Sequence, residues 1–277
     1  MKTQAEKGAA FAALHARPGI FLIPNPWDAG SARLLEHLGF EALATTSAGF
    51  AFSRGKCDST MGRDETLSHA AAIVAATDLP VSADLENCFG DSPETVAETI
   101  RLAANTGLAG GSVEDSTGRA ESPLYELAHA ADRVRAAAEA AHALPFRFTL
   151  TARAENFLVG RPDLSGTIAR LQAYQQAGAD VLYAPGLRTK EEVATVVRSV
   201  DRPVNVLASA QFSVAALAEL GVRRISVGGA LARAAYGAFL SAAREMREHG
   251  TFEFAGHAIS HRDITEIFQG MVLRGAS

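Results

Sequence analysis

From about residue 20 onward, short runs of apolar or β-branched residues alternate with longer segments of helical periodicity. In the segment 189–200, for example, Val193, Val196 and Val197 fall on one stripe of a helix. Such alternation is typical of βα units that build a parallel sheet. We count eight units, with predicted strands at 20–24, 42–47, 81–86, 111–115, 148–153, 181–185, 204–207 and 224–228.

Eight βα units in about 230 residues fit a (β/α)₈ barrel, which typically takes about 250 residues. A doubly wound open sheet is the alternative, because alternation alone fits both folds. In the segment 148–153, however, three apolar residues alternate with Thr149, Thr151 and Arg153, which gives one face that is polar toward the carboxyl end. We therefore predict an α/β protein with one (β/α)₈ barrel domain over residues 1–277, extended by C-terminal helical sequence from about residue 250.

The composition of the chain argues against several classes of protein. The chain is 48% hydrophobic and has no apolar run of the roughly 20 residues that span a bilayer, and its first residues lack the apolar core of a signal peptide, so we expect a cytoplasmic protein. A net charge of −5 without a basic run argues against nucleic acid as a partner, and nothing indicates a membrane partner. Cys57 and Cys88 are too few for a disulfide framework and lack metal-site spacing.

Three carboxylates stand on two neighbouring predicted strands. Asp84 and Glu86 share one face of the strand 81–86, within about 7 Å of each other, and Glu114 lies on the polar face of the next strand. Like charges at this separation raise one another's pKa or recruit a cation. Three oxygen ligands without a histidine favour Mg²⁺ or Mn²⁺ over zinc. A structural ion-pair network is the alternative interpretation.

The other strand ends complete a rim that is acidic on one side and carries Arg153 on the other. This layout suits a metal chelated by an anionic substrate whose far carboxylate meets the guanidinium, although Arg153 could instead pair with Glu114 or Glu155. The remaining rim candidates are Asn25, Trp27, Asp28, Ser47, Ala48, Gly49, Asp115, Tyr183, Asn205, Gly228 and Gly229.

The sequence bears differently on two other classes of barrel enzyme. Gly228 and Gly229, which open the last helical segment, also suit the phosphate site that many barrels build there, and this favours an enzyme acting on a phosphorylated metabolite. A Schiff-base aldolase is excluded more firmly, because no predicted strand carries a lysine.

Five short motifs, in order between about residues 18 and 235, give the chain a family resemblance. They are Asn25-Pro26-Trp27-Asp28, Thr46-Ser47-Ala48-Gly49, Asp84-Leu85-Glu86-Asn87, Val113-Glu114-Asp115-Ser116 and Thr151-Ala152-Arg153. Together they resemble the isocitrate lyase and phosphoenolpyruvate mutase superfamily. The resemblance implies a (β/α)₈ barrel, commonly with its last helix exchanged between the subunits of a homodimer or homotetramer. It also implies Mg²⁺ and a 2-oxo acid, or its enolate, as the substrate.

By position, Asp84 is similar to the family's direct metal ligand, and Glu86 and Glu114 are similar to the residues that hold the metal's waters. The turn Ser47-Ala48-Gly49 resembles the backbone cradle for the substrate carboxylate. Our assignment is therefore Arg153, Asp58 and Glu114 as catalytic, Asp84, Glu86 and Glu114 as metal-binding, and Ser47, Ala48, Gly49, Trp27, Arg153 and Asn205 as substrate-binding.

The loop after the fourth predicted strand departs from the family pattern. Residues 114–122 contain no cysteine, histidine or lysine, whereas lyases of the family carry a catalytic cysteine there and the mutase and hydrolase branch uses a lysine and an asparagine. We predict a Mg²⁺-dependent enzyme that makes or breaks a carbon–carbon bond at C3 of a small 2-oxo-dicarboxylate, as a lyase or an oxaloacetate-type decarboxylase. Decarboxylation is favoured slightly, because CO₂ leaves without acid–base help. The alternatives are carbon–phosphorus chemistry on phosphonopyruvate, and a 2-oxo-acid-binding protein without catalysis.

Overall fold

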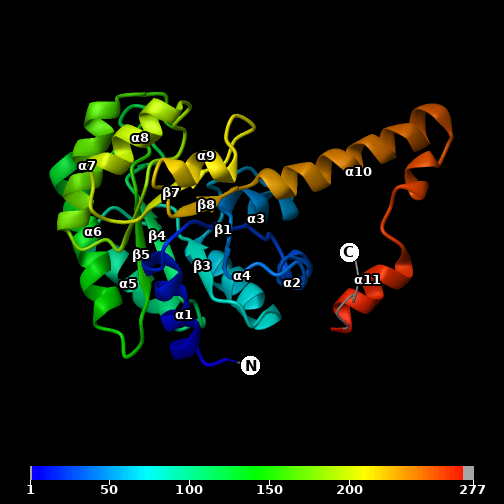
Figure 1. Cartoon of the computed structure of the whole chain (residues 1–277), viewed down its shortest axis with the longest axis horizontal. Helices are drawn as coiled ribbons and strands as arrows, with labels where there is room; N and C mark the ends of the chain where they lie inside the picture. Colours follow the sequence, from blue (N-terminus) through cyan, green and yellow to red (C-terminus); the bar gives the residue numbers. More distant parts are fainter. Residues whose placement is uncertain (1, 271–277) are drawn as a thin grey trace.

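Eight parallel strands form a nearly closed barrel with helices on its outside (Figure 1). The computed structural model describes residues 2–270. Neighbouring strands are hydrogen-bonded in the order β1-β8-β7-β6-β5-β4-β3-β2. The strands are β1 (Phe21–Ile23), β2 (Leu43–Ala44), β3 (Val81–Asp84), β4 (Gly110–Glu114), β5 (Thr149–Arg153), β6 (Val181–Tyr183), β7 (Val204–Leu207) and β8 (Arg224–Ser226).

Helices follow the strands, as the eight-unit pattern predicts, and three α-helices of the described residues add to that pattern. The first, α1, precedes β1, the second, α3, lies between β2 and α4, and the third, α11, lies in the predicted C-terminal extension. The helices are α1 (Gln4–Ala16), α2 (Ala29–His37), α3 (Ser47–Ser53), α4 (Arg63–Ala76), α5 (Pro93–Ala104), α6 (Leu127–His142), α7 (Leu164–Gln176), α8 (Lys190–Arg198), α9 (Val214–Glu219), α10 (Ala230–His249) and α11 (His261–Phe268), with a 3₁₀ turn, η1, at Glu253–Gly256.

The predicted barrel is confirmed, and each predicted strand overlaps an observed one, but several predicted strands are too long. The predicted strand 42–47 is observed only at Leu43–Ala44, and Ser47 begins α3.

The prediction for β3 is also too long. This strand ends at Asp84, and Glu86 adopts the left-handed conformation with a φ of 50°. Cys88 and Phe89 are left-handed as well. The expectation that Glu86 continues the strand face of Asp84 was therefore wrong, because the chain turns before the alternation reaches it.

The barrel has a seam between β1 and β2, which share no ladder of hydrogen bonds. Pro24 has no N–H to continue such a ladder, although its carbonyl still accepts from the Ala44 N–H at 3.1 Å. The buried Asn25 amide spans the seam. Its Nδ2 donates to the Thr45 carbonyl at 3.0 Å, and its Oδ1 accepts from the N–H groups of Val227 and Gly228, both at 2.9 Å. One side chain therefore joins the ends of β1, β2 and β8.

Helix α1 packs against the amino-terminal end of the barrel (Figure 1). It begins with a capping box between Thr3 and Glu6. Gly8 permits the close approach, because a Cβ there would lie 2.1 Å from the Arg147 carbonyl oxygen. His15 on this helix is buried, and its Nδ1 lies 2.8 Å from the Phe11 carbonyl. That contact makes Nδ1 the protonated nitrogen, so Nε2 is free to accept from Arg224 at 3.3 Å.

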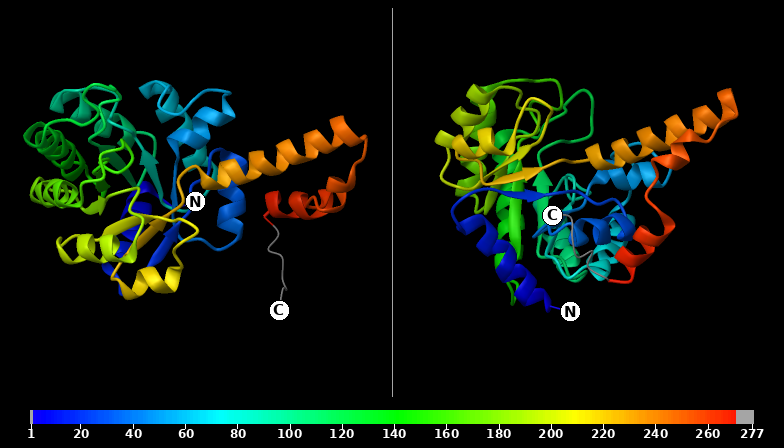
Figure 2. Two further views of the ribbon diagram at one scale, coloured as in Figure 1. Left: turned by 90° about the horizontal axis from the view of Figure 1, so that it is seen from above. Right: turned by 45° about the vertical axis from the view of Figure 1, so that its right-hand side comes forward.

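Helix α10 does not fold back on the barrel but extends away from it (Figures 1 and 2). The chain then returns through η1, and α11 packs on α2, where the Arg33 guanidinium lies 5.4 Å from the centre of the Phe268 ring. Of the apolar residues in the predicted extension, Met271 lies outside the described residues. Between residues 2 and 270, no helix combines the length and apolar character needed to cross a membrane.

The burial of His15 predicts a pH-dependent stability. Burial, with the nearby Arg224 charge, lowers the His15 pKa from 6.5 to about 3. Between these values the unfolded chain binds a proton that the folded protein does not, so stability rises with pH across this window. Going from pH 7 to pH 5, wild type should lose about 2 kcal/mol more unfolding free energy than His15→Gln, whose amide oxygen can accept from Arg224 without titrating. Urea unfolding at both pH values measures this, and equal losses in the two proteins would contradict it.

Candidate active site

A cavity of about 290 Å³ opens among the carboxyl ends of the strands and reaches into the barrel. Most of the side chains that line it are small or polar, where barrels usually hold bulky branched ones. Its lining comprises Ile23, Asn25, Ala44, Thr45, Thr46, Ser47, Ala48, Asp58, Ser82, Ala83, Asp84, Ser112, Arg153, Leu158, Tyr183, Asn205, Leu207, Arg224, Ser226, Gly228, Gly229 and Arg233.

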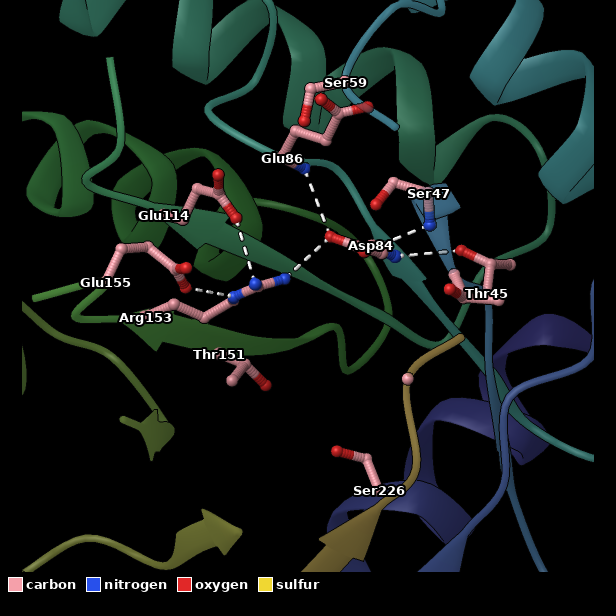
Figure 3. A network of polar contacts seen from close by, with 12 residues as sticks. Thr45, Ser47, Ser59, Asp84, Glu86, Glu114, Thr151, Arg153, Glu155 and Ser226 are labelled. Atoms are coloured by element: carbon pink, nitrogen blue, oxygen red, sulfur yellow. Dashed lines mark hydrogen bonds and ion pairs between the residues drawn. The ribbon is translucent and has the colours of Figure 1, made fainter. Parts of the chain in front are cut away.

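The Arg153 guanidinium, at the end of β5, lies between three carboxylates (Figure 3). Its Nη1 is 2.9 Å from Asp84 Oδ1, its Nη2 is 3.1 Å from Glu114 Oε2, and its Nε is 2.8 Å from Glu155 Oε1. The parallel register explains the arrangement, because Glu114 and Arg153 are direct partners across β4 and β5. The sequence predicted that Arg153 and the carboxylates share a rim, and it offered pairing with Glu114 or Glu155 as an alternative role. The structure contains both of those pairs.

Burial sets the electrostatics of this cluster. It raises the pKa of Glu114 well above its usual value, and Arg153 only partly opposes this effect. Burial likewise raises the pKa of Glu155. For Arg153, burial favours the neutral form, but Glu155, Glu114 and Asp84 outweigh it and raise the guanidinium pKa further. Arg153 therefore stays protonated, and the three carboxyl groups around it outnumber its one positive charge.

Glu86 is an acidic residue of this rim that is not among the ion-pair partners of Arg153. In Figure 3 its side chain lies beside Ser59, away from the guanidinium. Its Oε1 is buried without a hydrogen-bond partner in the part of the chain that the structure describes. Burial, followed by the charges of Asp84 and Asp58, raises the Glu86 pKa to about 7. An orphaned carboxylate oxygen close to two other acids is the environment that a bound cation stabilises.

The predicted substrate cradle is the first turn of α3. Thr46 caps this helix by accepting from the Gly49 N–H at 3.3 Å, and the Ser47 N–H donates to Asp84 Oδ2 at 3.2 Å. The first N–H groups of a helix have no acceptor within the helix. Because Asp84 and Thr46 already accept from Ser47 and Gly49, the Ala48 N–H is the donor of this turn that remains for a ligand in the cavity. Ser47 and Ala48 line the cavity, whereas Gly49 lies behind them, where a Cβ would lie 2.6 Å from the Thr46 methyl carbon.

The acidic residues fit a hydrated Mg²⁺ better than a metal fully enclosed by protein. Within residues 2–270, no three Asp, Glu, His or Cys side chains converge on one metal position. Mg²⁺ usually keeps several waters and takes only one or two carboxylates. Asp84, which lines the cavity, and the orphaned Glu86 fit that pattern, and Glu114 adds charge from behind Arg153.

The remaining predicted residues fall into two groups. Asp58, Asn205 and Tyr183 line the cavity, as the rim prediction requires. Trp27 is not among the lining residues, and its carbonyl oxygen lies 2.8 Å from His69 Nε2. Asp115 is buried on the far side of β4, where it accepts from Tyr174 at 2.5 Å and from the Glu155 N–H at 2.8 Å. Its contacts hold the end of β5 in place.

Two residues that the sequence prediction did not include in the site belong to its structure. Glu155 is the third carboxylate on Arg153, and Arg224 lies inside the barrel at the start of β8. The signal for Glu155 was its position two residues after Arg153. Arg224 follows Arg223 directly, and this pair gives no indication of which guanidinium points inward.

The loop after β4 contributes nothing to the cavity lining. Residues 116 and 124 form an antiparallel bridge, and the Thr117 N–H donates to the Pro123 carbonyl at 2.9 Å. Arg119 ties the loop to Asp91 at 2.9 Å. None of the residues 116–122 lines the cavity.

Comparison with known proteins finds similarity to a family of enzymes. The model of the phosphoenolpyruvate phosphomutase family matches residues 11–247. A crystal structure of a Burkholderia cenocepacia J2315 protein, provisionally described as a lyase/mutase, is 62% identical, covers 96% of each chain and superposes with a TM-score of 0.94.

Two curated relatives extend the comparison. An uncharacterised protein of Mycobacterium tuberculosis is 33% identical over 79% of this chain and 81% of its own. The oxaloacetate decarboxylase of Pseudomonas savastanoi pv. phaseolicola is 27% identical over 86% of this chain and 84% of its own.

The Arg153 cluster predicts a stability effect that depends on pH. Arg153→Gln leaves three largely buried carboxylates without their cation, and removal of one partner from a buried ion pair costs about 3–5 kcal/mol. The pKa values of Glu114 and Glu155 then rise further above those of the unfolded chain, so the loss should be larger at pH 7.5 than at pH 5.5.

Arg17→Gln is the matched control, because it removes an Arg–Glu pair whose side chains are 42% and 51% exposed. It should change the unfolding free energy by at most about 1 kcal/mol. Urea unfolding at both pH values measures the two variants, and an Arg153→Gln loss no larger than this control would refute the role given to the cluster.

Proposed function

This chain belongs to the phosphoenolpyruvate phosphomutase family, and from that premise we propose that it is a Mg²⁺-dependent enzyme that breaks or forms the C3 bond of a small 2-oxo-dicarboxylate. The observation that carries this proposal is the acidic edge of the cavity. Asp58 and Asp84 line it, and the half-buried Glu86 beside them has a buried oxygen without a partner in the described residues.

Different residues of the cavity would bind the metal and the substrate. Asp84 would hold Mg²⁺ directly, with Glu86 and Glu114 holding its waters, and the Ala48 N–H in the first turn of α3 would donate to the substrate carboxylate. Mg²⁺ in this position supplies Lewis-acid stabilisation of the negative charge that develops on the 2-oxo oxygen. Arg153 fixes the position of Asp84 through their 2.9 Å ion pair.

Among the reactions of this type, decarboxylation of an oxaloacetate-like acid has the most support. Aldol cleavage requires an acid or base near the leaving product, and the loop that supplies it in family lyases lies outside this cavity. Loss of CO₂ requires no such group. The similarity to an oxaloacetate decarboxylase agrees with this choice. Carbon–phosphorus chemistry on phosphonopyruvate is the second candidate, which the family relationship favours.

Turnover should depend on Asp84 and on the metal. A panel of oxaloacetate, 2-oxoglutarate, pyruvate, isocitrate, methylisocitrate and phosphonopyruvate is assayed for product with Mg²⁺ and with EDTA. We expect CO₂ and pyruvate from oxaloacetate, and at least a 100-fold lower kcat for Asp84→Asn, in proportion to the several kcal/mol that Lewis-acid catalysis supplies.

Asp64→Asn, at a side chain that is 95% exposed, is the matched control and should keep full activity. Product from phosphonopyruvate alone would select the second candidate. Ligand-induced stabilisation without any product would favour a binding protein, and activity that survives EDTA would exclude the metal-dependent reaction.

We also propose that the protein forms a homodimer or homotetramer through exchange of α10. Leu22 points outward from β1 and is 38% exposed, at the position where a barrel normally packs its last helix. On α10, Phe239 is 68% exposed and Leu240 is 50% exposed. Exchange between two copies would cover both apolar surfaces at once.

Light scattering after size-exclusion chromatography tests the exchange. Wild type should elute as a dimer or tetramer, and the double variant Phe239→Ser/Leu240→Ser should shift toward monomer. Arg247→Ser, near the end of the same helix, should leave the assembly unchanged. A monomeric wild type would rule out the exchange.

A further inference from the structure

The floor of the cavity carries a buried guanidinium that the proposed reaction does not yet use. Arg224 begins β8, lines the cavity and is only 5% exposed. It forms no ion pair with any carboxylate in residues 2–270. Arg153, by contrast, contacts three carboxylates.

Three neutral groups hold Arg224 in place. Its Nε donates to Asn205 Oδ1 at 2.8 Å, its Nη2 donates to Thr151 Oγ1 at 3.1 Å, and its Nη1 lies 3.3 Å from the neutral His15 ring. A guanidinium has five N–H donors, so three neutral contacts leave two donors for another acceptor. The contacts orient the group without neutralising its charge.

A second buried arginine shows how this protein satisfies a guanidinium that has only a structural role. Arg133 is 1% exposed, and its side chain donates to the backbone carbonyls of Asn87, Gly90 and Asp91 at 2.5–2.7 Å. It does not line the cavity. Arg224 faces open space instead, and an uncompensated buried cation next to a cavity attracts an anion.

The depth of Arg224 indicates the length of ligand that would reach it. Thr151, its hydrogen-bond partner, lies two residues before Arg153 on the inward face of β5, which corresponds to about 7 Å along the strand. Asp84 contacts Arg153 and therefore marks the upper level. A four-carbon dicarboxylate extends about 6 Å between its outermost oxygens, given C–C bonds of about 1.5 Å.

We propose that Arg224 binds the far carboxylate of the substrate at the cavity floor, and so selects 2-oxo-dicarboxylates of about four or five carbons over monocarboxylates. This inference rests on the proposed function and deepens it, because it assigns the second carboxylate to Arg224 instead of to Arg153. Asn205, Thr151 and His15 are positioning residues that aim the guanidinium upward into the cavity.

Calorimetric titration with matched pairs of unreactive acids tests the proposal. The pairs are 2-oxoglutarate with 2-oxopentanoate, and succinate with butyrate, in Mg²⁺ at constant ionic strength. Wild type should bind one or both dicarboxylates about 10- to 100-fold more tightly than the matching monocarboxylate, as expected for hydrogen bonds to a charged group. Arg224→Gln should reduce this ratio to about one while leaving monocarboxylate binding unchanged.

Two further variants serve as controls for the role of Arg224. Arg223→Gln changes the neighbouring arginine, which contacts the Arg17 and Gly19 carbonyls, and it should keep the wild-type ratio. Arg224→Lys keeps the charge and should keep part of the preference, even if Arg224→Gln fails to fold. A wild type with no preference in either pair, or an Arg224→Gln variant that retains it, would overturn the proposal.

The oxaloacetate assay separates this proposal from the proposed function. Mg²⁺-dependent turnover with no effect of Arg224→Gln on KM would leave the reaction standing and remove the role of Arg224. Binding that depends on Arg224, with no turnover of any acid, would keep the carboxylate site and remove the reaction.

Discussion

The guanidinium of Arg153 holds three carboxylates together at the rim of this barrel. Arg153 contacts Asp84 from β3, Glu114 from β4, and Glu155 just after its own strand, so one cation links three consecutive segments of the rim. Its charge is what opposes the rise in the pKa of Glu114 and of Glu155 that burial causes. The positions of Asp84 and of the α3 turn that donates to it both follow from this cluster.

The interior of the barrel holds small and polar side chains around a cavity instead of a tightly packed apolar core. Barrels of this type usually fill their centre with branched apolar side chains, but here Ala44, Ser82, Ser112 and Ser226 leave a cavity. The main apolar core lies instead between the barrel and its helices, where Leu150, Ile100 and Leu171 are fully buried. Stability and ligand binding are therefore supplied by opposite faces of the same strands.

Strand alternation and the barrel rule were sufficient to predict the eight strands, and to place Asp84, Glu114 and Arg153 at one rim. The turn at Glu86 could not be predicted in this way, because no glycine marks it and distant contacts impose its left-handed conformation. Arg133, from α6, donates to the Asn87 carbonyl, and the Glu114 N–H donates to the Glu86 carbonyl at 3.0 Å. Both partners lie far along the chain, so local patterns do not contain them.

The seam between β1 and β2 makes the barrel a split ring. All other neighbouring strands are joined by ladders of backbone hydrogen bonds. At this gap, the Asn25 side-chain amide and the Pro24 carbonyl make the connecting hydrogen bonds. One lip of the gap continues into the α3 turn, and the opposite lip adjoins Gly228 at the start of α10. Because the fewest hydrogen bonds join the strands at this gap, the barrel should yield most easily there. Such a movement would widen the opening of the cavity before it displaced Arg153 on β5, at the opposite side of the barrel.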